Sequence, residues 1–308
     1  MTRVVVLGSL NIDLVIRVPH LPSPGETVTG HSFFQAPGGK GANQAVAAAK
    51  LGANVHMVGR VGGDAFGVAL RESLRAAGAD DSCVISTPDV STGVALIFVD
   101  DEGENVIVLD SAANARLSTQ DVEAASSQIS EADALLLQLE VPLETVLRAA
   151  QAARNGTAHL ILNAAPAREL PGELFPLVDT LVVNREELAA LSGSRAEPRE
   201  AAGALLAKGC GAVLVTLGAE GSVLVREGEA THVPAFRVEA VDTTAAGDTF
   251  AAAYAVASLE GADPETRLRF ANAAAALTVT RAGAQIGMPA RAEVEAFLQA
   301  RPLEAGRL

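Results

Sequence analysis

The chain has 308 residues, of which 49% are hydrophobic, so it can bury a sizeable core as one large α/β domain or as two smaller ones. A formal net charge of −14 argues against a nucleic-acid-binding or anionic-membrane surface, because both require clustered Lys and Arg. Two distant cysteines support neither a disulfide framework nor a zinc site, and no apolar run reaches the roughly 20 residues of a membrane helix. We therefore expect a cytoplasmic protein without nucleic-acid or membrane partners.

Short β-branched runs alternate with Ala- and Leu-rich segments of helical period, which is typical of βαβ units and a mostly parallel sheet. The expected strands of that sheet are Val4–Leu7, Val55–Val61, Ala134–Leu139, His159–Leu162, Thr180–Val183 and Ala212–Leu217. The expected helices are Ala42–Leu51, Phe66–Ala77, Leu143–Arg154, Arg185–Leu191 and Arg199–Lys208.

Two pairs of strands interrupt this alternation. Ile12–Val18 with Thr27–Gln35, and Gly93–Val99 with Glu104–Leu109, have the pattern of hairpins. Residues 94–99 are apolar at every position, so we expect a substrate on one face of this strand and a second subunit on the other. The alternative is an ordinary buried strand of the main sheet.

The segment 242–250, Asp-Thr-Thr-Ala-Ala-Gly-Asp-Thr-Phe, leads into an apolar helix at 251–259. Its small residues let a phosphate approach the backbone, and the free N–H groups of a helix start bind anions without a lysine. Asp248 would repel that phosphate unless it accepts a proton from an attacking hydroxyl while the amides of Ala245, Ala246 and Gly247 hold the charge. The alternative is an acidic residue that only stabilises the helix dipole.

A second glycine-rich segment, Pro-Gly-Gly-Lys-Gly-Ala-Asn at 37–43, also precedes a helix. It lacks the glycine and hydroxyl positions of a Walker A loop, and no dinucleotide glycine fingerprint follows the first strand, which argues against a nicotinamide-dependent oxidoreductase. Lys40 and Asn43 instead offer groups suited to hydroxyls, although such a segment can be only a turn.

Polar residues follow several predicted strands, where ligands bind in open α/β sheets. Glu140 follows 134–139, and Asn184 with Glu187 follows 180–183. These side chains can hold sugar hydroxyls or magnesium-bound water, but Asn184 and Glu187 equally fit a helix cap. Residues 216–221 end one strand and enter the next, so a hairpin turn is an alternative to a ligand site there.

In this order, the segments resemble the PfkB carbohydrate kinase family and, within it, the ribokinases. The segments at 38–44 and 242–250 match the two signature regions of the family, and further similarity lies at 9–13, 92–99, 103–106 and 279–285. The resemblance covers nearly the whole chain. It implies a single domain over residues 1–308 with a ribokinase-like three-layer α/β fold, a mostly parallel central sheet and a small β-sheet lid from about 12–36 and 92–110. It also implies a homodimer formed through the lids.

The family pattern assigns roles to individual residues. The sugar would be held by Asn11, Asp13, Gly39, Lys40, Gly41, Asn43 and Glu140, with Ala95 and Ile97 of the lid against it. The nucleotide would contact Asn184, Thr216, Leu217, Gly218, Ala219, Glu220, Gly221, Gly247 and Asn272, and Glu187 would organise the waters of Mg²⁺. Asp248 would be the base, and the amides of residues 245–247 would form the anion hole.

The resemblance also implies a K⁺ site and an adenine pocket, and the chain departs from the family at both. The cation would be held by Asp242, Thr244, Thr278, Arg281, Gly283 and position 287. Relatives have a serine at that last position, and Gly287 removes its hydroxyl ligand. Asn272 stands where relatives often have a histidine, which alters the stacking on adenine.

The implied reaction is transfer of the γ-phosphoryl group of ATP to the 5-hydroxyl of D-ribose, giving ribose 5-phosphate and ADP, with Mg²⁺ and K⁺. Alternatives are a family member that phosphorylates 2-deoxyribose, fructose or a nucleoside, and a non-catalytic sugar-binding protein. The set of Asn11, Asp13 and Glu140 favours a free pentose, and the presence of Asp248, Gly247 and Lys40 favours catalysis.

Overall fold

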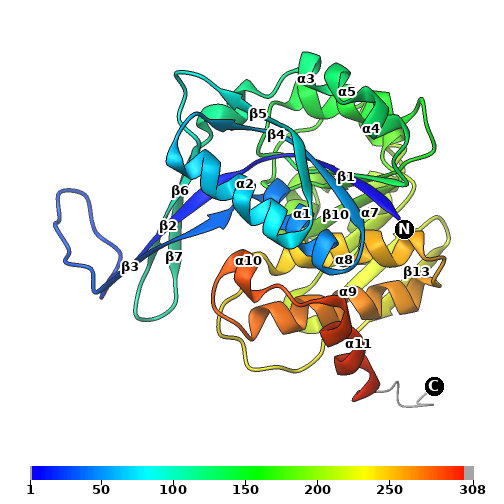
Figure 1. Cartoon of the computed structure of the whole chain (residues 1–308). Helices are drawn as coiled ribbons and strands as arrows, with labels where there is room; N and C mark the ends of the chain where they lie inside the picture. Colours follow the sequence, from blue (N-terminus) through cyan, green and yellow to red (C-terminus); the bar gives the residue numbers. More distant parts are fainter. Residues whose placement is uncertain (1, 302–308) are drawn as a thin grey trace.

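A nine-stranded sheet lies at the centre of the computed structural model, which describes residues 2–301 (Figure 1). Its strand order is β13-β12-β11-β10-β9-β8-β1-β4-β5. The strands are β1 (Arg3–Leu7), β4 (Asn54–Gly62), β5 (Asp80–Thr87), β8 (Ala134–Leu137), β9 (His159–Asn163), β10 (Thr180–Asn184), β11 (Val213–Thr216), β12 (Ser222–Arg226) and β13 (Glu229–Val233). Neighbouring strands from β5 to β11 are parallel, whereas the β11–β12 and β12–β13 pairs are antiparallel. The predicted mostly parallel sheet is confirmed.

Helices cover both faces of this sheet, because alternate residues of each strand point to opposite sides. Val4 and Val6 of β1 pack in one core and Val5 and Leu7 in the other. The first core includes residues of α1 (Lys40–Lys50), α2 (Ala65–Ala77), α8 (Ala246–Leu259), α9 (Pro264–Val279) and α11 (Arg291–Gln299). The second includes residues of α3 (Thr119–Ala124), α4 (Ser126–Ser130), α5 (Leu143–Ala153), α6 (Arg185–Ser192) and α7 (Pro198–Leu206). The three-layer α/β fold is confirmed.

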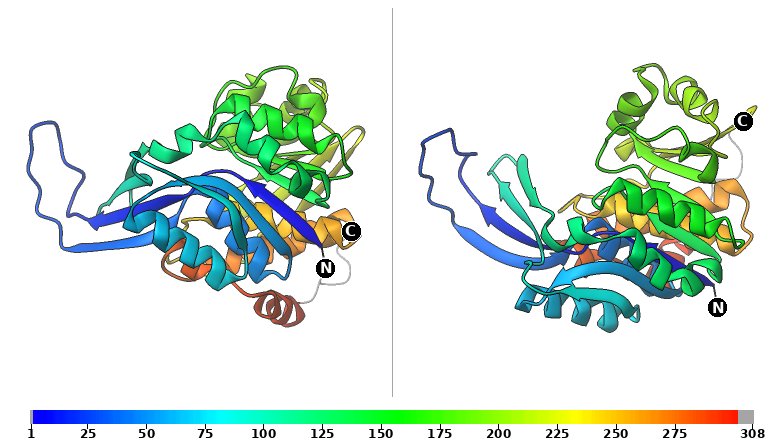
Figure 2. Two further views of the ribbon diagram at one scale, coloured as in Figure 1. Left: turned by 45° about the horizontal axis from the view of Figure 1, so that its top comes forward. Right: turned by 90° about the horizontal axis from the view of Figure 1, so that it is seen from above.

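A second, four-stranded sheet extends from one side of the molecule (Figure 2). Its order is β3 (Ser32–Gly38), β2 (Asn11–Arg17), β6 (Gly93–Val99) and β7 (Asn105–Asp110). The β2–β3 and β6–β7 pairs are antiparallel, as the hairpin patterns predict, and β2 pairs with β6 in parallel. The alternative of a strand at 94–99 in the main sheet is therefore wrong. We call this second sheet the lid.

Several boundaries differ from those predicted. The strand expected from residue 27 begins at Ser32, the partner of Arg17, because Pro19 follows β2 and has no N–H with which to extend the ladder. β8 ends at Leu137 rather than Leu139. The segment 218–220 forms a short 3₁₀ turn between the antiparallel β11 and β12, which confirms the hairpin alternative for this region. Within residues 2–301, no helix is both long and apolar enough to cross a bilayer.

Candidate active site

Asp248 lies in the first turn of α8, after a tight backbone turn. Ala245 has a φ of 61°, a left-handed conformation that redirects the chain into the helix. The Ala246 amide donates to the Thr243 carbonyl at 3.3 Å, and the Thr249 amide donates to the Ala245 carbonyl at 2.9 Å. Among residues 2–301 no acceptor is found for the Gly247 amide, so this N–H at the helix start is available to an anion.

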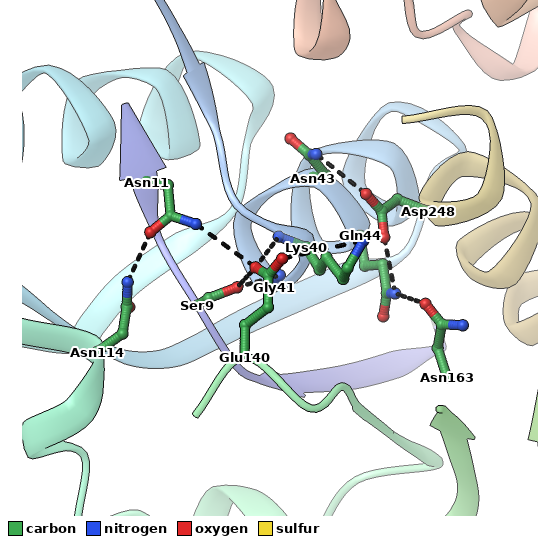
Figure 3. A network of polar contacts seen from close by, with 10 residues as sticks. All are labelled: Ser9, Asn11, Lys40, Gly41, Asn43, Gln44, Asn114, Glu140, Asn163 and Asp248. Atoms are coloured by element: carbon green, nitrogen blue, oxygen red, sulfur yellow. Dashed lines mark hydrogen bonds and ion pairs between the residues drawn. The ribbon is translucent and has the colours of Figure 1, made fainter. Parts of the chain in front are cut away.

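The buried carboxylate of Asp248 accepts one side-chain amide on each oxygen (Figure 3). Gln44 Nε2 donates to Oδ1 at 3.1 Å, and Asn43 Nδ2 donates to Oδ2 at 3.0 Å. Burial raises the pKa of Asp248 above its ordinary value, although Lys40 and the two amide donors act in the opposite direction. Each oxygen retains a lone pair with which to accept a proton from a bound hydroxyl.

Glu140, which follows β8, joins the start of α1 to the start of the lid. Its Oε2 accepts from Ser9 Oγ at 2.6 Å, from the Lys40 amide at 3.2 Å and from Asn11 Nδ2 at 3.5 Å (Figure 3). The carboxylate therefore sits at the N-terminus of α1, where the helix dipole stabilises a negative charge. Its Oε1 lies 3.9 Å from Lys40 Nζ.

The backbone between β3 and α1 passes unusually close to the chain after β1. Gly39 has a φ of 86°, and a Cβ there would lie 2.6 Å from the backbone nitrogen of Asn11. A Cβ on Gly41 would lie 2.6 Å from the Ser9 nitrogen. Both contacts are far below van der Waals distance, so only glycine fits at these two positions. The glycines thereby bring Lys40 and Asn43 next to Asn11 and its neighbours.

Lys40 provides the positive charge among these carboxylates. Burial alone would lower the pKa of its ammonium, but the nearby carboxylates of Asp248 and Glu140 raise it above the ordinary value. The side chain also lines the same cavity as Asp248 and Glu187. A charged lysine in this position can neutralise an anionic group that enters between them.

Asp13 of β2 lies on the face of the lid that carries Ala95. In the β2–β6 pair Asp13 is opposite Ala95, and residues opposite each other point to the same side of a sheet. Ala95 and Ile97 are two residues apart and share this buried face. Burial raises the pKa of Asp13 to about 7, and the charges of Glu140 and Asp248 add to the shift.

Two cavities adjoin at Gly247. Their volumes are about 510 Å³ and 230 Å³, and a Cβ on Gly247 would meet no atom within 4 Å. Of the predicted nucleotide-binding residues, the larger cavity is lined by Thr216, Gly218, Ala219, Gly221, Gly247 and Asn272. The smaller cavity is lined by Asn184, Glu187, Thr216 and Gly247 together with Lys40 and Asp248.

Other predicted nucleotide-binding residues have additional or different contacts. Asn184 and Glu187 form a reciprocal capping box, with two hydrogen bonds of 2.8 Å, so the helix-cap interpretation is confirmed although both residues face the smaller cavity. Asn272 donates to the Val233 carbonyl at 3.1 Å, which fixes its amide at the cavity wall. Leu217 and Glu220 do not line either cavity, because Leu217 packs on the core and Glu220 pairs with Arg185 at 2.7 Å.

The predicted cation-binding segments are connected by Asp242. Its Oδ1 accepts from the Thr244 amide and its Oδ2 accepts from the Gly283 amide, both at 2.9 Å, and these donors help to lower its pKa although burial acts to raise it. A Cβ built on Gly287 would lie 3.3 Å from the Thr278 carbonyl oxygen and 3.5 Å from that of Arg281. These carbonyls and position 287 are therefore neighbours.

Several residues of the site were not predicted. Asn114 Nδ2 donates to Asn11 Oδ1 at 2.7 Å, which turns the other end of the Asn11 amide toward Glu140. Gln138 Nε2 donates to Gln44 Oε1 at 2.6 Å, and Gln44 Nε2 also donates to Asn163 Oδ1 at 3.2 Å. Gln44 stands in the second glycine-rich segment and could have been found there. Asn114, Gln138 and Asn163 lie in distant parts of the sequence and carry no local signal.

Comparison with known proteins gives consistent matches over almost the whole chain. The model of the pfkB family carbohydrate kinases matches residues 1–291. Ribokinase of Haemophilus influenzae is 42% identical over 298 residues, which cover 96% of this chain and 97% of that protein. The crystal structure of ribokinase from Thermotoga maritima superposes with a TM-score of 0.89 at 41% identity, covering 97% of this chain and 99% of that one.

The Arabidopsis thaliana ribokinase, whose structure is complexed with ribose and ATP, superposes with a TM-score of 0.88 at 35% identity. That match covers 96% of this chain and 98% of the Arabidopsis chain. The three-layer α/β architecture agrees with these structural matches. The chain belongs to the pfkB family of carbohydrate kinases.

Proposed function

We propose that the protein transfers the γ-phosphoryl group of ATP to the 5-hydroxyl of D-ribose. The observation that carries this proposal is the position of Asp248, a buried carboxylate at a helix start on the wall of the smaller cavity, beside the larger cavity. The proposal is supported by the ribokinases among its relatives, one of them complexed with ribose and ATP.

The sugar would lie between the lid and the start of α1. Asn11, Asp13, Asn43 and Glu140 supply both donors and acceptors to its hydroxyls, and Ala95 with Ile97 would press against the ring. Hydrogen bonds of this kind discriminate strongly, because a sugar without the matching hydroxyl leaves a buried polar group unpaired. The hydrogen bonds from Asn114 to Asn11 and from Asn11 to Glu140 would orient these groups before the sugar binds.

The nucleotide would occupy the larger cavity, whose volume and mainly apolar walls suit an adenosine group. Gly247 at the junction would place the γ-phosphate beside Asp248. The sugar oxygen then attacks phosphorus in line, the bond to the β-phosphate oxygen breaks to release ADP, and Asp248 takes the hydroxyl proton. Lys40 and the Gly247 amide would offset the charge of the transferring group. Mg²⁺, when bound with its waters near Glu187, would supply further charge neutralisation.

A monovalent cation is a finer part of this proposal. The carbonyls of Thr278 and Arg281 lie beside position 287, and Asp242 joins the loop before α8 to Gly283. Backbone carbonyl oxygens are ligands that can replace the hydration shell of K⁺. The absent serine hydroxyl at position 287 should weaken binding. Introducing it with Gly287→Ser should lower the K⁺ concentration for half-maximal activity by about tenfold, roughly 1.4 kcal/mol. The assay is a K⁺ titration of both proteins. An unchanged midpoint would place the cation elsewhere.

We also propose a homodimer formed through the lids. Leu96 and Val108 are opposite each other in the β6–β7 pair and are 43% and 54% exposed, and Val106 and Phe33 on the same face are 45% and 65% exposed. An apolar sheet face of this kind is commonly covered by a partner. A second copy with the same face would bury it around a twofold axis.

The direct test is a coupled assay of ADP release with D-ribose, 2-deoxy-D-ribose, D-fructose and adenosine. Each is measured in K⁺ and in an equal concentration of tetramethylammonium, which is too large for a carbonyl-lined site. We expect the highest kcat/KM with D-ribose and a further increase with K⁺. Preference for another sugar would support the alternative kinases. Absence of turnover with every acceptor would support the non-catalytic sugar-binding protein.

A further inference from the structure

A chain of three hydrogen bonds runs from the surface of α2 to Asp248. Ser73 Oγ donates to Gln285 Oε1 at 2.6 Å, Gln285 Nε2 donates to Asn43 Oδ1 at 3.2 Å, and Asn43 Nδ2 donates to Asp248 Oδ2 at 3.0 Å. Gln285 and Asn43 are each 5% exposed, so water cannot easily replace either partner. The chain joins four elements that are far apart in the sequence.

Only one orientation of the Asn43 and Gln285 side-chain amides allows all three hydrogen bonds to form. An ionised carboxylate accepts hydrogen bonds and cannot donate them, so the Nδ2 end of Asn43 must face Asp248. The Oδ1 end then faces Gln285, which must present its own Nε2 end. Reversing Asn43 would bring its carbonyl oxygen against the Asp248 carboxylate, and two buried acceptors without a proton between them repel.

The backbone around Gln285 is itself fixed on both sides. Lys50 Nζ donates to the carbonyls of Gln285 and Met288 at 2.8 and 3.0 Å. Two residues earlier, the Gly283 amide donates to Asp242 Oδ2. The short helix α10 (Ala284–Gly287) is therefore held between α1 and the loop that precedes α8, and Gln285 has little freedom to turn away from Asn43.

We propose that Gln285 is a positioning residue that fixes which end of the Asn43 amide faces Asp248. Gln285 lines neither the larger nor the smaller cavity, so we expect it to act only through Asn43. The expected effect of Gln285 on turnover rests on the proposed function, in which Asp248 accepts the proton of the sugar hydroxyl. The orientation of Asn43 itself can be tested without any assay of activity.

The stability test is a double-mutant cycle of Gln285→Glu with Asn43→Ala. Glutamate has nearly the shape of glutamine but presents two acceptors, so Asn43 must reverse and meet Asp248 with its oxygen. We expect Gln285→Glu to lower Tm by about 3 °C or more, and to lower it far less in the Asn43→Ala background, where no amide can reverse. An equal loss in both backgrounds would show a direct charge or packing effect and would overturn the proposal.

The kinetic test compares Gln285→Glu with Gln285→Met, which has similar size and no acceptor. We expect a loss in kcat of about tenfold or more for the glutamate variant and a smaller loss for methionine, because Asn43 then keeps its favourable orientation. The exposed Gln120→Glu in α3 introduces the same chemical change away from the site and should match the wild type. A methionine variant as impaired as the glutamate variant would contradict the proposal.

The pH profile provides a readout that loss of packing would not change. Lys40 from α1, Asp13 from β2, Glu140 after β8 and Glu187 from α6 face Asp248 and remain in all variants. A reversed Asn43 destabilises the ionised carboxylate, so the acid limb of kcat against pH should move upward by about one unit in Gln285→Glu. The limb should move less when Asn43→Ala is added, because only the new charge at position 285 then acts on Asp248. An unchanged limb would overturn the proposal. If the activity assays of the wild type or of Asp248→Asn contradict the proposed function, the double-mutant cycle of stability still tests the role of Gln285.

Discussion

At the scale of single residues, Asp248 combines opposing influences. Burial favours its protonated form, whereas Lys40, Asn43 and Gln44 favour the ionised form that a base requires. A carboxylate with such donors is a weak base, but the proton of the attacking hydroxyl becomes acidic as the bond to phosphorus forms. The surrounding amides therefore favour the ionised form of Asp248 and hold its carboxylate in place.

Replacing Asp248 with asparagine should lower kcat by about a thousandfold, because a general base typically contributes 10²–10⁴-fold. The affinity for ribose should change little, since asparagine keeps the shape and an acceptor. Turnover is measured by ADP release and ribose binding by calorimetry. Asp101→Asn, in the exposed β6–β7 turn, is the matched control. A variant with most of its activity would remove Asp248 from the proposed role.

Asp13 should make the stability of the ligand-free protein depend on pH. Its pKa of about 7 in the folded protein, against an ordinary value of 3.8, means that folded protein holds a proton that unfolded protein has released. Between about pH 4 and 7 the wild type should therefore lose stability relative to Asp13→Asn as the pH rises. The slope is about 1.4 kcal/mol per pH unit, and the difference levels off above pH 7. Urea unfolding across this range measures the free energy of unfolding of both proteins. If the two plots of that free energy against pH were parallel, the raised pKa of Asp13 would be contradicted.

At the scale of elements, we propose a different role for each of the two faces of the lid. Asp13 and Ala95 are on the face with the site residues, whereas Leu96 and Val108 are on the opposite face. β6, whose residues 94–99 are all apolar, thus presents an apolar side to each of these two faces. An exposed apolar sheet face is also a risk for non-specific association, which a specific partner removes.

Changing Leu96 to lysine should convert the proposed dimer to a monomer, because a charge would be buried at the centre of the paired faces. Sedimentation analysis should show the mass falling by half at micromolar protein. Val68→Lys is a suitable control, since Val68 of α2 is 57% exposed but outside the lid. An unchanged mass for Leu96→Lys would indicate that the lid face does not form the interface.

The local pattern of the sequence predicted most of the central sheet and the lid hairpins, because hydrophobic period and turn residues act over short distances. It anticipated a strand after residue 221 but gave no bounds for β12, and it missed β5 and β13 as strands and α9 as a helix. α9 carries little amphipathic pattern, since its second half is rich in Ala and it packs against α8 on one side and strands on another. Pattern recognition is weakest where both faces of a helix are buried.

The candidate site was predicted best where its residues share a segment. Lys40 and Asn43, and Ala245 to Asp248, stand in glycine-rich stretches whose composition already indicates a ligand. Asn114 and Gln285 could not be assigned a role, because their contacts join residues more than a hundred positions apart. Only the folded chain brings such side chains together.

At the scale of the whole molecule, sugar binding should stabilise the fold, because the proposed ribose site joins the lid to the central domain. A ligand at a hundred times its dissociation constant adds about 2.7 kcal/mol, which should raise Tm by about 4 °C in a protein of this size. The measurement is thermal unfolding with D-ribose, with L-ribose as a control of identical composition. Equal effects of the two enantiomers, or no effect, would contradict a specific sugar site.

The junction between β3 and α1 has a consequence for how the chain tolerates changes in length. β3 ends at Gly38 and α1 begins at Lys40, so one residue separates the lid from the helix that carries Asn43 and Gln44. A single inserted residue there would rotate that helix start by about 100° relative to the lid. The loop at 18–31 leaves from the far end of the same hairpin and meets no such limit. A reporter or a new terminus therefore belongs in that loop, where it can follow the lid without disturbing the sugar site.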